Sequence, residues 1–188
     1  MNRRLLASVF IAILALTGCA LPRVVDNEVR AFSRLPAIVA PATYRIDRLM
    51  SQQASDGAQA VYEQMLVAAL LRAGLRPDEQ SPAYAVQFAV REQKLDRTIW
   101  DDPLRLVYRR PGGGWNVFGG MPLSYYLREV NILLRDLGTG QVVFETRAYH
   151  EGRWPDSLKV LPAMFQAALA DFPQPPAGSR TIDVAIEP

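Results

Sequence analysis

A hairpin signature in residues 126–149 constrains the fold of this chain more than any other feature. Its first half directs every second residue to one face: Tyr126, Arg128, Val130, Ile132 and Leu134. A period of two is typical of a strand that buries one face. Gly138-Thr139-Gly140 then offers a turn, and residues 141–149 form a second β-rich run. The sequence therefore predicts two antiparallel strands joined by that turn.

Four more segments are rich in the β-branched and aromatic residues that favour strands. They are residues 24–32, 43–47, 84–90 and 181–186. Pro36 and Pro41 mark a loop after the first of them.

Two segments have helical spacing. Ser55-Asp56 offers N-caps for a helix to about Ala73, and Gly74 is placed to end it. Its apolar face is expected to join the core rather than form a partner groove, and comprises Val61, Tyr62, Met65, Leu66, Ala69 and Leu70. A second helix is expected from Asp156, with its apolar side formed by Leu158, Leu161, Phe165, Ala168, Leu169 and Phe172. Pro162 either kinks this helix or occupies its N1 position.

The order of these elements predicts an α+β two-layer sandwich. We expect a mostly antiparallel sheet of about five or six strands, with two helices packed on one face. The length of 188 residues suits a single core, and we place one domain at residues 24–188.

The first eighteen residues have the order of a secretory signal: a basic start, an apolar run over Leu5–Leu16, and small residues. The run is shorter than the roughly 20 residues that cross a bilayer. Leu16-Thr17-Gly18-Cys19 resembles the bacterial lipobox, which implies cleavage between Gly18 and Cys19 and acylation of the Cys19 thiol and amine.

Residues 19–23 would then be a lipidated tether. Two or three acyl chains, such as palmitate, hold a protein firmly at a membrane. Ala20 follows the cysteine, and in lipoproteins of this kind that favours the outer membrane, with the domain facing the periplasm. The alternative is a secreted protein with an incidental cysteine.

Charge argues against nucleic acid as a partner. Removing Arg3 and Arg4 with the signal leaves 19 basic residues against 19 acidic ones. The basic residues are scattered, whereas nucleic-acid binding needs them clustered.

Several segments, taken in order, resemble a family of proteobacterial lipoproteins catalogued as domain of unknown function 4136 (DUF4136). The resemblance rests on residues 43–49, 51–53, 128–130, 139–147, 152–154 and 171–173. It implies a lipid-anchored envelope domain with an α+β fold, and it implies no activity.

Residues for catalysis or metal binding are sparse. His150 is the only histidine, and we expect it to be a polar residue at the end of the fifth strand rather than a general base. Cys19 is consumed by lipid, and no serine lies in a Gly-x-Ser-x-Gly elbow. Asp101-Asp102 suits a solvated loop better than a catalytic pair. We predict no catalytic residue, metal ligand or cofactor.

The segment from Lys94 to Met121 is unusually long for a connection. Its glycine cluster at residues 112–120 lacks the Gly-Lys-Ser/Thr ending of a phosphate-binding loop, so we expect a flexible loop. The segment also carries aromatic and arginine residues suited to recognition: Trp100, Tyr108, Arg109, Arg110, Trp115 and Phe118. The alternative is a strand such as Leu104 to Tyr108 that extends the sheet, followed by an irregular hairpin.

The leading hypothesis is a non-enzymatic outer-membrane lipoprotein that binds another envelope component or has a structural role. Two alternatives stay open. One is an envelope hydrolase that uses carboxylates not paired in the sequence. The other is a carrier of a small apolar ligand between helix and sheet.

Overall fold

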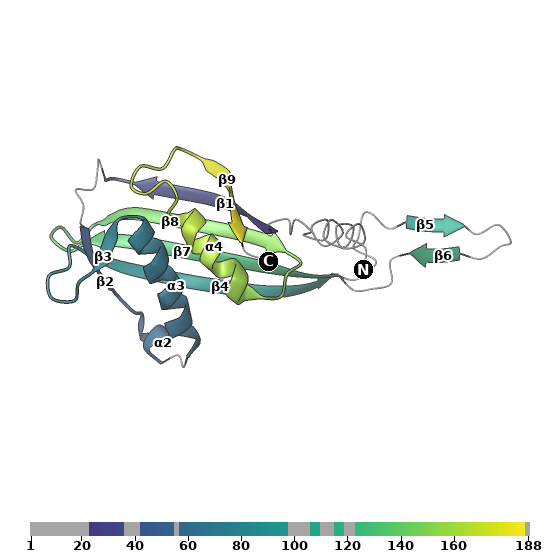
Figure 1. Cartoon of the computed structure of the whole chain (residues 1–188), viewed down its shortest axis with the longest axis horizontal. Coiled ribbons are helices and arrows are strands. Elements are labelled where there is room, and N and C mark those ends of the chain that lie inside the picture. The colour runs from purple at the N-terminus through teal and green to yellow at the C-terminus, as the bar shows by residue number, and fades with distance from the viewer. Residues whose placement is uncertain are drawn as a thin grey trace, which may run out of the picture.

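A mixed seven-stranded sheet forms the body of the protein (Figure 1). The computed structural model describes residues 23–35, 42–54, 57–97, 106–109, 115–118 and 123–186. The strand order is β3-β2-β4-β7-β8-β1-β9. These strands are β1 (Arg23–Ser33), β2 (Ala42–Ile46), β3 (Leu75–Pro77), β4 (Tyr84–Arg97), β7 (Leu123–Asp136), β8 (Val142–Gly152) and β9 (Ser179–Ile186).

The predicted hairpin is confirmed as β7 and β8, which pair antiparallel. The Asp136 carboxylate accepts a hydrogen bond from the Thr139 backbone N–H at 2.7 Å and holds the turn. Gly140 has a φ of 72°, a backbone conformation that glycine adopts without steric cost. The turn residues therefore fix the register of the two strands.

A second long hairpin joins β4 to β7 and carries two further strands. β5 (Leu106–Arg109) and β6 (Trp115–Phe118) pair only with each other in the described sheets, between β4 and β7 in the chain. We call β5 and β6 the arm; Figure 1 draws it beyond the ends of β4 and β7. The expectation of a loop is corrected at these residues. The alternative is right that a strand forms here and wrong that it extends the sheet, because β5 pairs with β6 in a separate two-stranded sheet.

The sheet is larger and less uniform than predicted. It has seven strands rather than five or six, and β2 runs parallel to both β3 and β4. The three-residue β3 and the four-residue helix α2 (Met50–Gln53) were not expected. The α+β class is confirmed.

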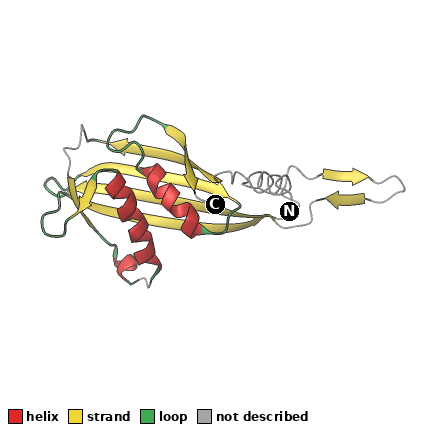
Figure 2. Cartoon of the chain, viewed as in Figure 1, coloured by secondary structure: helices red, strands yellow, loops and turns green. Residues whose placement is uncertain are grey.

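Both long helices cover one face of the sheet (Figure 2). They are α3 (Ala58–Arg72) and α4 (Ser157–Ala168), and none of the helices in the described residues is long and apolar enough to cross a bilayer. Large side chains from both layers fill the core between them: Tyr44, Leu66, Leu70, Phe88, Ile132, Leu134, Phe144, Leu161, Met164 and Phe165.

The predicted helical faces need two corrections. Val61 is 37% exposed and Leu158 is 61% exposed, so neither belongs to the core. Pro162 lies inside α4, whose N-cap is Asp156, and the alternative of Pro162 at N1 is wrong. Asp156 accepts a hydrogen bond from the Leu158 N–H at 3.1 Å, and the helix begins at Ser157, five residues before Pro162.

The first and last strands of the domain pair with each other. Arg23 lies opposite Ile186, and β1 is enclosed between β8 and β9. Arg23, which the sequence analysis placed in the tether at residues 19–23, is therefore the first residue of β1, and residues 19–22 lie outside the described residues.

The aromatic contact between helix and sheet can be tested by truncation. Phe165 is fully buried, and its ring packs edge-to-face on Phe88 with centroids 6.0 Å apart. Phe165→Ala should lower the free energy of unfolding by about 3–5 kcal/mol in urea denaturation because it leaves a cavity. Leu158→Ala on the same helix should change it by less than about 0.5 kcal/mol. Equal effects of the two changes would contradict this assignment of the core.

Candidate functional site

A row of polar side chains crosses the helix-covered face of the sheet. Glu92 on β4 lies opposite Arg128 on β7, and Arg128 lies opposite His150 on β8. Asn27 continues the row on β1, one step beyond the pairing of Glu28 with Tyr149. We call these four residues the polar row. Arg128, His150 and Asn27 are 1%, 4% and 0% exposed.

Arg128 is the centre of the polar row. Its Nε donates to the Ser157 hydroxyl at 2.9 Å, and its Nη2 donates to the Trp154 carbonyl at 2.7 Å. The Ser157 hydroxyl in turn donates to the Glu92 carboxylate, which lies 3.7 Å from the Arg128 Nε. Because Ser157 is the first residue of α4, these bonds fasten the start of that helix to two strands.

Glu92 has a second donor in the Tyr62 hydroxyl of α3, at 2.9 Å. Burial and this hydrogen bond together raise the pKa of Tyr62. Burial lowers the pKa of Arg128, and the nearby Glu92 carboxylate acts in the opposite direction. The carboxylate therefore compensates the buried guanidinium and links both long helices to the sheet.

His150 is held by the neighbouring strand. Its Nδ1 lies 2.7 Å from the Asp26 carbonyl, which orients the ring. A Cβ at Gly152 would lie 2.5 Å from the His150 Nε2, so glycine is needed there for the close approach. The fifth predicted strand is β8, and the prediction that His150 lies near its end is confirmed. The burial of His150 was not predicted.

Three atoms of the polar row have no hydrogen-bond partner among the described residues: Arg128 Nη1, His150 Nε2 and Asn27 Oδ1. Each belongs to a buried side chain. No group of three His, Cys, Asp or Glu that could hold a metal ion occurs in the described part of the chain. The contacts that are formed join secondary-structure elements, and the row acts chemically as a polar fastening within the core.

Removing the central guanidinium tests this role. Arg128→Ala should cost about 3–5 kcal/mol of unfolding free energy, because it replaces a large, fully buried side chain by a cavity and removes its hydrogen bonds to Ser157 and Trp154. Arg147 is the matched control, since its side chain is 62% exposed and pairs with Glu129 at 3.4 Å. Arg147→Ala should cost less than about 1 kcal/mol. Urea denaturation of both variants would show whether burial separates them, and similar losses would count against the polar fastening.

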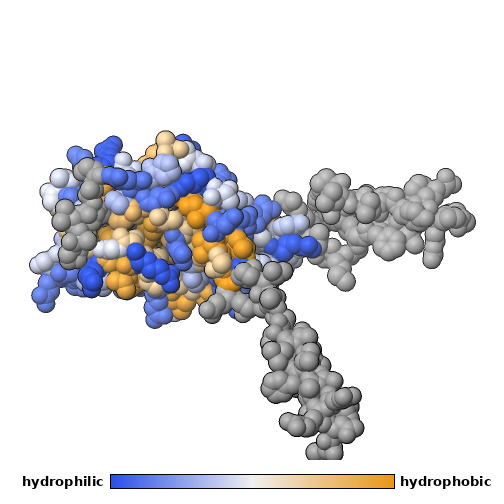
Figure 3. Space-filling view, turned by 45° about the horizontal axis from the view of Figure 1, so that its top comes forward, coloured by the Kyte–Doolittle hydropathy of each residue, from blue (hydrophilic) through white to orange (hydrophobic). Residues whose placement is uncertain are grey.

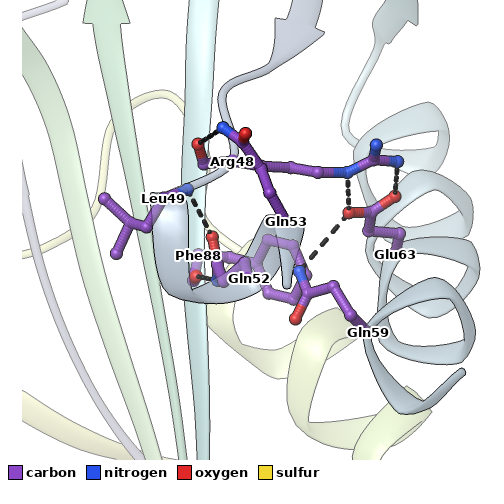
Figure 4. Close-up of polar contacts among 7 residues, drawn as sticks. All are labelled: Arg48, Leu49, Gln52, Gln53, Gln59, Glu63 and Phe88. Carbon is purple, nitrogen blue, oxygen red and sulfur yellow. Dashed lines mark hydrogen bonds and ion pairs between the residues drawn. The ribbon is translucent and has the colours of Figure 1, made fainter. Parts of the chain in front are cut away.

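A second polar cluster surrounds α2 (Figure 4). Arg48 binds Glu63 of α3 through two hydrogen bonds of 2.6 Å, one from Nε and one from Nη2. The Gln52 amide donates to the Phe88 carbonyl at 2.7 Å and accepts from the Leu49 N–H at 2.9 Å. These contacts hold the short helix α2 between β4 and α3.

The Arg48 hydrogen bonds lower the pKa of Glu63, although burial of the carboxyl group opposes the change. A carboxylate with a lowered folded pKa stabilises the fold above its unfolded pKa. That contribution is lost as the pH falls through the folded pKa.

The lowered pKa of Glu63 predicts a stability difference that depends on pH. Glu63→Gln should reduce the unfolding free energy by about 1 kcal/mol at neutral pH, because the half-exposed Arg48 limits the strength of the pair. The difference from wild type should disappear well below the ordinary glutamate pKa of about 4.3. Urea denaturation at neutral and acid pH measures it. The exposed Glu145→Gln should show no such difference. A Glu63→Gln loss that persists in acid would contradict the ion pair.

A surface hollow of about 540 Å³ lies between α4 and β9. Figure 3 shows this side of the molecule, where apolar residues gather between hydrophilic margins. Arg72, Lys159 and Gln166 contribute polar groups to its lining. The apolar residues of the lining are Leu158, Pro162, Ala163, Val184, Ala185 and Ile186. This hollow is open at the surface, unlike the filled core between helices and sheet.

Some of the residues predicted to be functional lie outside the described part of the chain, and others lie on the arm. Gly18, Cys19, Trp100 and Arg110 lie outside the described residues, as does the Asp101-Asp102 pair. Four others lie on the arm: Tyr108 and Arg109 on β5, and Trp115 and Phe118 on β6. The arm brings Arg109 opposite Trp115. The sequence analysis missed the polar row, although Arg128 occupies a core-facing position in the alternation of β7.

Comparison with known families decides the relationship. The family described as Domain of unknown function (DUF4136) matches residues 29–174, most of the chain. The chain belongs to the DUF4136 family. Residues of the family resemblance thus have physical roles in this DUF4136 domain: Gly152 leaves room for His150, and the Trp154 carbonyl binds Arg128. No curated protein sequence matches the chain.

Solved structures of other proteins align with this chain. A PDZ domain protein from Parabacteroides distasonis aligns with a TM-score of 0.54 at 12% identity. That match covers 94% of this chain and 42% of the other, so this chain spans less than half of its length. A PelC dodecamer from Paraburkholderia phytofirmans aligns with a TM-score of 0.45 at 18% identity, covering 77% of this chain and 95% of PelC. At 12% identity, the first likeness concerns the fold alone.

Proposed function

We propose that this DUF4136 protein is a lipid-anchored, non-enzymatic binding or structural module that faces the periplasm from the outer membrane. One observation carries the proposal: β1 begins at Arg23, four residues after Cys19. Four residues span at most about 14 Å. An acylated Cys19 would therefore hold the sheet directly against the membrane surface.

The arm supports the binding role. β5 and β6 form a two-stranded sheet separate from the seven-stranded one. A projecting hairpin rich in aromatic residues and arginine offers contact area and charge-assisted hydrogen bonds to a partner. The polar row supports a non-enzymatic role, because Glu92, Arg128 and Ser157 bond to one another across β4, β7 and α4.

Cell fractionation with two variants tests the anchor. The wild-type protein should begin at Cys19, carry acyl chains by mass analysis, and fractionate with the outer membrane. Cys19→Ser should remain unacylated, because a hydroxyl does not replace the thiol nucleophile, and should leave that fraction. Ala20→Asp should keep the acyl chains and move to the inner membrane. An unmodified thiol or a different first residue in the wild-type protein would overturn the proposal.

The hollow between α4 and β9 favours a second candidate, a carrier of a small ligand with an apolar part and a negative charge. The mixed lining, with six apolar residues beside Arg72, Lys159 and Gln166, suits that chemistry. Native mass spectrometry of the purified protein tests it, since a ligand that co-purifies with the wild type should be lost in Ala185→Trp, which fills the hollow from an exposed position of β9. The remaining alternative, an envelope hydrolase, would require reproducible turnover by the purified protein.

A further inference from the structure

The strand directions bring five points of the chain to one end of the seven-stranded sheet. Arg97 at the end of β4 pairs with Leu123 at the start of β7, which are the two strands that carry the arm. The end of β8 at Gly152 lies opposite Tyr126, near the start of β7. Arg23 at the start of β1 pairs with Ile186 at the end of β9. We call this the anchor end of the sheet.

Strand register sets how close the arm lies to the point where the chain enters the domain. Glu28, Tyr149, Glu129 and Arg91 form one row across β1, β8, β7 and β4. Counting five residues along each strand toward the anchor end leads to Arg23 on β1, Ser124 on β7 and Asp96 on β4. These three residues are therefore level with one another, close to the base of the arm. One strand separates β1 from β7, so the lateral distance is about 10 Å. The start of β1 and the ends of β4 and β7 that carry the arm therefore lie side by side.

The chemistry of the anchor end suits a lipid–water interface. The Arg23 guanidinium lies 5.4 Å from the centre of the Trp154 ring. The arm adds Tyr108, Arg109, Trp115 and Phe118. Tryptophan and tyrosine concentrate at headgroup level, and arginine is attracted to anionic lipids.

Charge in the arm region agrees with this setting. Residues 98–122 contain three arginines and two aspartates, together with two of the three tryptophans of the chain. A short tether of at most about 14 Å leaves little room between the anchor end and the headgroups. An arm that extends from this end must meet the bilayer before it can reach a distant partner.

We propose that the arm lies in the headgroup layer of the same bilayer that holds Cys19, so that the domain has two points of membrane contact. The inference rests on the proposed lipid anchor and names the membrane as the partner of the arm. The strands of the sheet then run away from the membrane, with the start of β2 and the turn between β7 and β8 at the distal end.

Tryptophan quenching in vesicles tests the proposal. The full acylated protein is reconstituted into phosphatidylcholine and phosphatidylglycerol vesicles, with or without bromine on the acyl chains. Trp100→Phe leaves Trp115 as the arm reporter, with Trp154 present throughout. The matched control adds Trp115→Phe and Phe32→Trp, which moves the reporter to the exposed Phe32 position at the distal end of β1.

Brominated chains should quench the arm reporter at least about 2-fold more than the distal reporter, because bromine acts only at short range from the interface. Equal quenching, with acyl chains on Cys19 confirmed by mass, would overturn the arm's membrane contact and leave the proposed anchor intact. An unquenched Trp115 that crosslinks to an envelope protein in cells would also overturn it, by assigning the arm to a protein partner. A reconstituted protein with an unmodified Cys19 would instead remove the anchor itself.

Discussion

The backbone pairing of β4 with β7 is the constraint on which the rest of the fold depends. All fourteen residues of β4 have Cα partners on β7, from Tyr84 opposite Asp136 to Arg97 opposite Leu123. Such a continuous register fixes which residues face the helices, because a slip of one residue would turn the apolar set outward. It also sets where the arm begins and which residues meet in the polar row.

Polar side chains then fix the helices on this sheet. The apolar core drives the two layers together without specifying their exact placement, whereas hydrogen bonds have direction. Ser157 and Tyr62 tie α4 and α3 to Glu92, and the Thr146 hydroxyl donates to the Ala168 carbonyl at the other end of α4 at 2.9 Å. Each helix is therefore positioned by bonds to the sheet in addition to apolar contact.

The sequence could predict the elements whose own residues determine them. The Gly138-Thr139-Gly140 turn and the alternation of β7 are local signals, and both were interpreted correctly. The α2 helix was missed because its stability comes from Gln52 binding the carbonyl of Phe88, which is distant in the chain. β3 was missed because three residues carry little pattern and its pairing with β2 is parallel and non-local. The polar row was missed, although the sequence contains one signal for it. Arg128 is the only charged residue among the alternate residues Tyr126, Arg128, Val130, Ile132 and Leu134, which share the core-facing side of β7.

The position of β1 has a consequence for the order in which the protein can fold. Both of its neighbours come late in the chain, β8 at Val142–Gly152 and β9 at Ser179–Ile186. Synthesis delivers the amino-terminal residues first, so this strand must wait unpaired until β8 has emerged. Pairings between distant segments close slowly. A truncation before residue 142 would remove both partners of β1 and leave it as an unpaired strand exposed to aggregation.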